Sequence, residues 1–280
     1  MILVTGATGA IGRHVITRLL DAGAKVRALT RDPDSATLPD GVDVTPGDLL
    51  VPSTMATAVR GVDAVFLMWP LATADAAPAV LNVLAGHARR IVFLSSGAVR
   101  DDLDEQVDPI GRLHAGVERS IEQSGMEWTF LRPHGFASNT LSWAPQIRAG
   151  DIVRGAYGTA AMTLLHELDV ASVAAHTLIG DEHTGRRYVL TGPEVLTQVE
   201  QVRILGEAIG RPLRWEEIPP NAARQHMLDW LPASIADVVL DGYARMATQP
   251  GPITSTVEDI TRVPARTFRE WATHHANHFS

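Results

Sequence analysis

Glycines at positions 6, 9 and 12 are spaced like those of a turn that holds a phosphate group. They follow the apolar run 1–5 and precede 14–22, which has the pattern of a helix. In such a strand–turn–helix unit, Gly6 allows the sharp turn, Gly9 leaves room for a phosphate, and Gly12 lets the helix pack on the strand. The unpaired N–H groups and positive end of that helix would face a pyrophosphate. The residues expected to line this dinucleotide site are Gly6, Thr8, Gly9, Ala10, Ile11 and Gly12.

The residue that follows the second predicted strand favours NADP(H) over NAD(H). This strand covers residues 24–29, and Thr30-Arg31 comes next. An arginine at this point can hold the 2′-phosphate of NADP through two hydrogen bonds, whereas an acidic side chain would bind the ribose hydroxyl of NAD. The neighbouring Asp32 keeps NAD(H) open as the less favoured cofactor, although Asp32-Pro33 also has the composition of a turn.

Side chains at the ends of later strands are candidates for contacts with the same cofactor. Ser95 and Ser96 close the fifth strand, where a hydroxyl can face a nicotinamide or a substrate, or can simply bond to the strand's own backbone. Asp48 can meet the edge of the adenine base or cap a turn. The other expected cofactor contacts are Leu49 after the third strand, Met68 and Trp69 after the fourth, and Pro133 at the end of the sixth.

Short apolar strands alternate with amphipathic helices through the first half of the chain. This alternation predicts a parallel sheet covered by helices on both faces, which is the Rossmann-type doubly wound α/β fold class. The expected strands cover residues 1–5, 24–29, 42–45, 62–68, 91–95 and 128–131. The expected helices cover residues 14–22, 53–60, 77–89 and 111–123.

The pattern loosens after about residue 133 and predicts a smaller, mostly C-terminal α/β lobe. The approximate division is a cofactor domain over 1–150 and a substrate-binding lobe over 151–280, interleaved because a strand over 187–191 is expected to return to the main sheet. Further expected elements are a helix over 169–178 capped by Asp169, a helix over 197–210 and a strand over 213–218. The residues expected to contact the substrate, unless they serve only in packing, are Trp69, His134, Phe136, Asn139, Trp143 and Tyr157.

The composition narrows the classes of protein to which this chain can belong. Of its 280 residues, 45% are hydrophobic and 20% are charged, which fits a globular protein with a substantial core. The net charge of −8 argues against a nucleic-acid partner, and the absence of cysteine excludes disulfides and thiolate chemistry. Because the chain has no long apolar run and begins with a strand, we expect no membrane contact and a cytoplasmic location. We also expect a small-molecule substrate. A homodimer stays open as a possible assembly.

Two histidines near the C-terminus have the spacing of metal ligands on a helix. His274 and His278 are four residues apart, so their side chains would share one helix face. We expect no acidic residue or third histidine to join this pair as a metal ligand. We therefore expect no metal site and interpret the pair as cations at the end of a helix.

Six short segments spread over nearly the whole chain form a recognisable set. The most specific are 124–133 (SGMEWTFLRP) and 188–193 (YVLTGP), and the others are 5–9, 29–31, 93–97 and 169–174. Together they resemble the NmrA-like branch of the atypical short-chain dehydrogenases/reductases. The resemblance implies a Rossmann domain with a small C-terminal lobe and bound NADP(H). Members of this branch are described as quinone, azo-dye or triphenylmethane-dye reductases, as isoflavone-type reductases, and as cofactor-sensing regulators without turnover.

The chain departs from the wider family at its usual catalytic pair. Most short-chain reductases carry Tyr-x-x-x-Lys on the helix after the fifth strand, where the tyrosine moves a proton and the lysine holds the nicotinamide ribose. Counting back from Glu118 places His114 at the lysine position and Ile110 at the tyrosine position. Isoleucine cannot transfer a proton, so alcohol–ketone chemistry with a tyrosine acid is not expected. His114 can bind a ribose hydroxyl, act as an acid near neutral pH, or be an ordinary half-buried histidine.

These residues favour an NADPH-dependent oxidoreductase that transfers hydride to an apolar conjugated acceptor of the quinone, azo, dye or enone type. Such an acceptor spreads the incoming charge over a delocalised system and water supplies the proton later, so a Tyr–Lys pair is not required. The catalytic candidates are His114 and Ser96. Two other functions stay open. One is an NADP(H)-sensing regulatory protein without turnover, and the other is a non-redox Rossmann enzyme such as an isomerase, cyclase or dehydratase.

Overall fold

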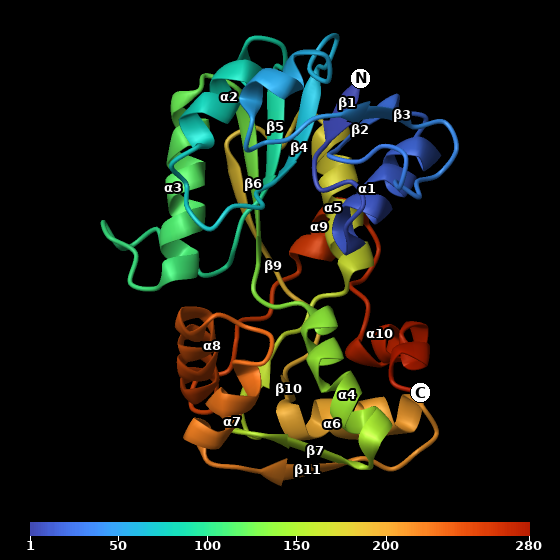
Figure 1. Cartoon of the computed structure of the whole chain (residues 1–280), viewed down its shortest axis with the longest axis vertical. Helices are drawn as coiled ribbons and strands as arrows, with labels where there is room; N and C mark the ends of the chain where they lie inside the picture. The colour runs from blue at the N-terminus through green and yellow to red at the C-terminus, as the bar shows by residue number, and fades with distance from the viewer. The chain divides into compact units, whose positions relative to one another are not determined.

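Seven parallel strands form one sheet in the computed structural model, which describes every residue from Met1 to Ser280 (Figure 1). In spatial order the strands are β3, β2, β1, β4, β5, β6 and β9, and each neighbouring pair is parallel. Their bounds are β1 (Ile2–Val4), β2 (Val26–Thr30), β3 (Asp43–Pro46), β4 (Ala64–Met68), β5 (Arg90–Leu94), β6 (Glu127–Pro133) and β9 (Arg186–Leu190). The prediction of a Rossmann-type doubly wound sheet is confirmed.

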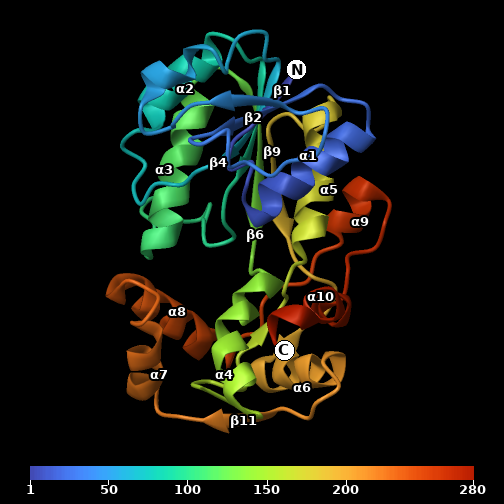
Figure 2. The same cartoon turned by 45° about the vertical axis from the view of Figure 1, so that its right-hand side comes forward.

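Helices cover both faces of this sheet. On one face α1 (Ala10–Asp21) packs against α5 (Glu167–Ile179), and on the other α2 (Ala77–Ala85) packs against α3 (Pro109–Gln123) (Figure 1, Figure 2). Every residue of β5 is buried, as are all but the last of β4. Because helices exclude water from both faces, β4 and the part of β5 after Arg90 are continuous apolar runs and show no alternation of polar and apolar residues.

The strand order reverses beside β1. The chain runs outward from β1 to β2 and β3, and then crosses to the other side of β1 to form β4. The connections after β1 and after β4 therefore leave in opposite directions and open a crevice at the carboxyl ends of these two strands. Open α/β sheets bind their ligands at such a point. The glycine turn directly follows β1, so the topology places it where a cofactor is expected.

The chain divides into two units that are interleaved along the sequence. The first comprises residues 1–133, 167–190 and 259–262, and the second comprises 134–166, 191–258 and 263–280. The chain first leaves the unit that contains the sheet after Pro133, earlier than the boundary predicted near residue 150. It returns to that unit as α5 and β9. There β9 pairs with β6 in parallel, with Tyr188 beside Leu131.

The second unit contains two small sheets and several helices around its own core. β7 (Ile152–Gly155) pairs with β11 (Arg214–Glu217), and β8 (Ala161–Met162) with β10 (Leu196–Thr197). The remaining elements of this unit are η2 (Ala137–Trp143), α4 (Ala144–Ala149), α6 (Gln198–Ala208), α7 (Pro220–Met227), α8 (Ala233–Met246), α10 (Phe268–His274) and η3 (Ala276–His278). Helix α9 (Thr256–Thr261) begins in the second unit and ends in the first. Trp271 is fully buried in this core. No helix of the chain has both the length and the apolar character needed to cross a bilayer.

The helix expected over 53–60 is much shorter in the structure. Only the 3-10 helix η1 (Pro52–Ala56) forms, and irregular turns follow it. The Thr54 hydroxyl donates to the Val51 carbonyl oxygen at 2.7 Å and accepts from the Asp48 N–H at 2.9 Å. A side chain that bonds to nearby backbone in this way competes with helical hydrogen bonds. The prediction of a regular helix was wrong for this reason.

The predicted helix cap at Asp169 is wrong, and a cap that was not predicted occurs at Thr197. Thr197 caps α6, and its backbone N–H donates to the Glu200 carboxylate at 2.8 Å while its hydroxyl accepts from the Glu200 N–H at 3.2 Å. Asp169 does not cap a helix, because α5 already begins at Glu167 and Asp169 is buried within its first turn. The reciprocal pair of a capping box needs Glu or Gln three residues after the cap, and Ser172 occupies that position after Asp169.

Gly12→Ala should destabilise the first unit, because the added carbon would stand 2.2 Å from the Gly6 carbonyl oxygen. Either the turn or α1 would have to shift, and crowding of this kind costs about 1–3 kcal/mol. Gly86→Ala is the control, since its added carbon meets nothing closer than 3.7 Å and its φ of −69° is ordinary. Urea unfolding of the two variants measures the difference. Equal free energies of unfolding would contradict this role for Gly12.

Candidate cofactor and active site

The glycine turn after β1 brings backbone atoms too close together for side chains to fit. Gly6 has a left-handed φ of 60°, and an added carbon there would lie 2.7 Å from Met68 Sδ. The Gly9 N–H donates to the Gly6 carbonyl oxygen at 3.0 Å and closes the turn. Gly6, Thr8 and Ala10 are exposed, whereas Ile11 and Gly12 are buried where α1 meets the sheet. The turn therefore presents mainly backbone to a ligand.

The amino end of α1 is open to an anion. Gly9 is the N-cap, no side chain caps the helix, and its first turn contains no acidic residue. Arg13 reaches back and donates through Nη2 to the Thr8 carbonyl oxygen at 3.2 Å, which places a cation beside the turn. Uncapped N–H groups and the positive end of a helix attract phosphate. The local structure fits the pyrophosphate that the sequence predicts.

Arg31 stands immediately after β2, at the same edge of the sheet as the glycine turn. Its side chain is exposed and makes no hydrogen bond or ion pair within the protein. The neighbouring Asp32 is engaged in a local turn, where its Oδ1 accepts from the Ser35 N–H at 3.3 Å. Hydrogen bonds from Ser35 lower the pKa of Asp32, so this carboxylate is ionised at neutral pH. Arg31 is thus available to a phosphate, while Asp32 serves the turn.

Asp48 and Leu49 follow β3 at this same edge. Asp48 Oδ1 accepts from the Leu50 N–H at 2.9 Å, so its carboxylate shapes a turn and keeps its other oxygen for a further partner. Leu49 is buried in the core of the first unit. Pro133 is buried at the end of β6.

Trp69 lies in the core of the first unit and not on its surface. The residue is 8% exposed, and its Nε1 donates to the Thr73 carbonyl oxygen at 2.9 Å. An indole whose faces are packed and whose N–H is satisfied has little left to offer a ligand. Met68, just before it, is half-buried and lies against Gly6. Of the two, Met68 is the one placed beside the turn.

The two serines after β5 have opposite hydrogen-bonding roles. Ser95 is buried, and its hydroxyl donates to Glu118 Oε1 at 2.5 Å. Ser96 is half-buried, and its oxygen accepts from the Ala98 N–H at 3.1 Å. The proton of Ser95 is therefore committed within the protein, whereas the proton of Ser96 is free to be donated to a ligand.

Glu118 and Arg132 form an ion pair that was not predicted from the sequence. Arg132 occurs in segment 124–133, one of those that suggested the family, whereas Glu118 served only as the reference point from which His114 and Ile110 were counted. In the structure both are buried, and Arg132 Nη2 lies 2.6 Å from Glu118 Oε2. An arginine within the apolar run of β6 was a usable signal, because a buried guanidinium requires a carboxylate partner.

His114 lies on α3 as a neutral ring with one nitrogen available. It is half-buried and stacks on Phe93, with ring centres 6.0 Å apart. Its Nδ1 is 2.9 Å from the Ile110 carbonyl oxygen, so Nδ1 carries the hydrogen and Nε2 of the neutral ring can only accept. Burial lowers the pKa of His114, although the hydrogen bond to Ile110 opposes this shift. The geometry therefore fits contact with a ribose hydroxyl and disfavours a proton donor at neutral pH, in contrast to the acid role that the sequence left open.

The other five candidates for substrate contact lie in the second unit. Phe136 is half-buried and forms a backbone bridge with Leu165. Trp143 is half-buried and packs edge-on against Trp215, with ring centres 5.9 Å apart. His134 and Asn139 are exposed, and Tyr157 is half-buried.

Tyr157 adopts a backbone conformation that is uncommon for a bulky residue. Its φ is 62°, and one carboxylate holds the chain in this state. Glu217 accepts from the Tyr157 N–H at 2.5 Å, from the Gly158 N–H at 2.9 Å, and from Trp215 Nε1 at 2.7 Å. Left-handed residues of this kind occur often at functional sites, where surrounding contacts maintain the strain. No local sequence pattern could have indicated this, because Glu217 is far from Tyr157 along the chain.

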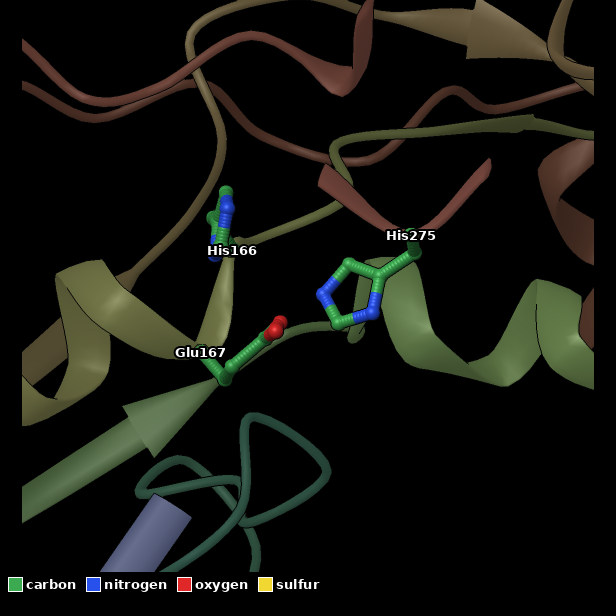
Figure 3. Close-up of side chains that lie close together, drawn as sticks. All are labelled: His166, Glu167 and His275. Carbon is green, nitrogen blue, oxygen red and sulfur yellow. The ribbon is translucent and has the colours of Figure 1, made fainter. Parts of the chain in front are cut away.

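Histidines of the second unit gather near its C-terminus. His166 is buried, and its Nε2 lies 3.1 Å from Nδ1 of His274. A ring nitrogen of His166 and one of His275 lie within 4.8 Å of each other, and Figure 3 shows these two rings with Glu167, the next residue of the chain. The sequence argument against a metal assumed that no third histidine joins His274 and His278. In the structure His166, separated from His274 by 108 positions, lies against it, and His275 is the next residue of the chain.

Comparison with known proteins relates the whole chain to reductases. The family described as NAD(P)H-binding matches residues 6–179, which is more than half of the chain. The chain is 43% identical to (4-alkanoyl-5-oxo-2,5-dihydrofuran-3-yl)methyl phosphate reductase of Streptomyces griseus, covering 100% of this chain and 99% of that protein. It is 34% identical to the NAD(P)H azoreductase of Xenophilus azovorans over the same shares. Among solved structures, triphenylmethane reductase of Citrobacter sp. has the same fold, with a TM-score of 0.83 and 19% identity, covering 99% of this chain and 100% of that chain.

We expect the affinity of the wild-type protein for NADPH not to vary with the protonation of His114 between about pH 7 and 9. The imidazole ring of His114 is already neutral throughout that range. A change should appear only below about pH 6.5, where protonation turns Nε2 from an acceptor into a donor. His114→Gln keeps a polar group and should bind better than His114→Ala. Titration of NADPH into the three proteins across this range measures the effect. A hydride-transfer rate that declines above pH 7 only when His114 is present would instead identify it as an acid.

Proposed function

The chain belongs to the NAD(P)H-binding family of NmrA-like atypical short-chain reductases, and from that premise we propose that it reduces an apolar conjugated acceptor with NADPH. It is an NAD(P)H-dependent oxidoreductase. The relatives named above act on an unsaturated furanone phosphate and on azo compounds. Both kinds of molecule accept hydride into a conjugated system. We infer that the acceptor of this chain is of the same broad class, which includes enones, quinones, azo compounds and dyes.

One observation carries the choice of NADPH. Arg31 is exposed, lacks any partner in the protein, and stands beside an uncapped helix end at one edge of the sheet. A guanidinium in this position can hold a 2′-phosphate, which NADH does not have. We assign the cofactor to the first unit. The proposed contacts are Gly6, Thr8, Gly9, Ala10, Ile11, Gly12, Arg31, Asp48, Leu49, Met68, Ser95, His114 and Pro133, with Trp69 supporting them from the core.

Bound NADPH would supply a hydride, and the protein would supply position and polarity. Neutral His114 would accept a hydrogen bond from a ribose hydroxyl through Nε2. The free proton of Ser96 would be donated to the atom of the acceptor on which negative charge develops. Because Ile110 cannot transfer a proton, water would complete the reduction. This division of roles suits an acceptor that already delocalises charge.

The second unit is proposed to contact the acceptor. Its candidates combine aromatic rings, from Phe136, Trp143 and Tyr157, with the polar groups of His134 and Asn139. Flat conjugated molecules are held well by aromatic faces with a few polar groups that fix orientation. The Glu217 carboxylate, which holds Tyr157 in its uncommon conformation, adds to the case for Tyr157.

We also propose a cytoplasmic location and a homodimeric assembly. The reductant NADPH is produced inside cells, which supports the first. Two-fold dimers are the commonest assemblies of identical chains, which supports the second. Fractionation of cells and sedimentation of the purified protein test these two points separately.

The reaction is tested by following NADPH oxidation with one acceptor of each kind. We expect turnover with at least one member of a panel containing a naphthoquinone, an azo dye, a triphenylmethane dye and an unsaturated lactone, and little with a simple saturated ketone. Gly9→Val should abolish turnover in a folded protein, since a branched side chain would occupy the space of the pyrophosphate. Circular dichroism verifies the fold. Binding of NADPH without reduction of any panel member would favour the sensing role instead.

Arg31→Ala should remove most of the preference for NADPH over NADH. Loss of a charge-assisted contact with the 2′-phosphate costs about 1.5–3 kcal/mol, which is roughly a tenfold to hundredfold weaker affinity. Arg119→Ala is the charge-matched control, because Arg119 is an exposed arginine of α3 away from the strand ends. Calorimetric titration with both cofactors measures the preference. An unchanged ratio of affinities in Arg31→Ala would rule out this assignment.

A further inference from the structure

We infer that Glu118 is a positioning residue for the reduction proposed above, acting through the hydroxyl of Ser95. The inference rests on the proposed function for its chemical meaning, and on a buried set of four side chains for its geometry. Ser95, Glu118, Arg132 and Asp101 form this set, which we call the strand-end network. It joins the end of β5, helix α3, strand β6 and the loop after β5.

Every polar atom of Glu118 is engaged in this network. Its Oε1 accepts from Ser95 Oγ at 2.5 Å and from Arg132 Nε at 2.9 Å, and its Oε2 accepts from Arg132 Nη2 at 2.6 Å. Ser95, Glu118 and Arg132 are each 4% exposed. Water therefore has little access to these groups, and their relative orientation is set by the protein.

Asp101 completes the network from the solvent side. Arg132 Nη1 and Nη2 donate to the two oxygens of Asp101 at 2.8 and 2.9 Å. Arg187 Nε lies 3.8 Å from Asp101 Oδ1 and adds a second positive charge. The hydrogen bonds from Arg132 lower the pKa of Asp101, which keeps it ionised. The carboxylates of Asp101 and Glu118 thus both accept hydrogen bonds from Arg132, and these bonds fix the orientation of the Glu118 carboxylate.

The hydrogen bond to Glu118 decides whether Ser95 can donate or accept a hydrogen bond with a ligand. A serine hydroxyl has one proton, and the proton of Ser95 is donated to a buried carboxylate. Its oxygen can then only accept a hydrogen bond from a ligand, such as the amide N–H of a nicotinamide. Ser96 keeps its proton and can only be a donor through it. The end of β5 therefore offers one acceptor and one donor in fixed order, and Glu118 sets that order.

The same residue also fixes the helix that carries His114. Residues four apart on a helix lie on one face, so His114 and Glu118 point to the same side of α3. The contacts of Glu118 with β5 and β6 prevent α3 from turning or sliding at that point. Displacement of a group by about 1 Å can lower a rate by roughly a hundredfold, so such a restraint has a functional effect.

A second network at the opposite ends of the same two strands provides a comparison. Arg90 begins β5 and is 3% exposed, and its Nη2 lies 3.3 Å from Glu127 Oε2 at the start of β6. This pair also joins a buried arginine to a glutamate, but it contacts no residue at the carboxyl ends of the strands. Loss of its charge should affect stability without affecting the cofactor. Glu127→Gln is therefore the matched control for Glu118→Gln.

The test separates binding of the nicotinamide half of the cofactor from binding of the adenine half. Affinities for NADPH and for 2′,5′-ADP, which lacks the nicotinamide, are measured by calorimetry for wild type, Glu118→Gln, Ser95→Ala, the double variant and Glu127→Gln. We expect Glu118→Gln and Ser95→Ala each to weaken NADPH roughly three- to tenfold and to leave 2′,5′-ADP unchanged. The double variant should be no weaker than the weaker single one. Ser95→Ala keeps the ion pair, so it remains informative if Glu118→Gln folds poorly.

The inference would be overturned if Glu118→Gln behaved like Glu127→Gln, with a lower unfolding temperature and an unchanged ratio of the two affinities. It would also be overturned if Ser95→Ala bound NADPH as wild type does. Failure of the proposed function looks different, because wild type would then bind NADPH but reduce no member of the acceptor panel. The affinity ratio does not depend on turnover, and so it decides the role of Glu118 in either case.

Discussion

The glycine turn and α1 can be arranged as they are only because Gly12 has no side chain. A carbon at that position would stand 2.2 Å from the Gly6 carbonyl oxygen, so α1 can lie against the turn only because residue 12 is glycine. This close approach directs the first N–H groups of α1 toward the carboxyl end of β1, beside the reversal of strand order. The proposed anion site would thus be made by the backbone. Arg31 and the serines after β5 would add specificity to a position that the turn defines.

Buried charge organises the two ends of β5 and β6 in different ways. At the amino ends, Arg90 pairs with Glu127 and donates to the Leu178 carbonyl oxygen at 3.3 Å, which ties the end of α5 to the sheet. At the carboxyl ends, Arg132 pairs with Glu118, which also holds a hydroxyl. A buried ion pair adds little net stability compared with well-packed apolar residues. Its main effect is on geometry, and only at the carboxyl ends does that geometry reach groups a ligand can contact.

The sequence predicted those features that depend on neighbours along the chain. The apolar runs of β4 and β5 and the glycine turn after β1 are local patterns, and the structure contains them. Features that depend on distant partners could not be predicted. Tyr157 owes its conformation to Glu217, and the ion pair of Glu118 with Arg132 requires α3 and β6 to be side by side. Trp69 was ambiguous for another reason, because an aromatic residue after a strand fits both a ligand contact and the core.

If neutral His114 occupies the place of the usual lysine, as we propose, it would restrict the kind of molecule that can be reduced. A lysine at this position would bring a permanent positive charge to the nicotinamide ribose, and that charge would help to stabilise an alkoxide forming nearby. Neutral His114 brings a lone pair on Nε2 and no charge, since its Nδ1 proton is donated to Ile110. An acceptor that concentrated negative charge on one oxygen would find only the hydroxyl of Ser96. An acceptor that spreads the charge over a conjugated system needs no more than that, which is why the proposed substrates are quinones, azo compounds, dyes and enones, and not simple ketones.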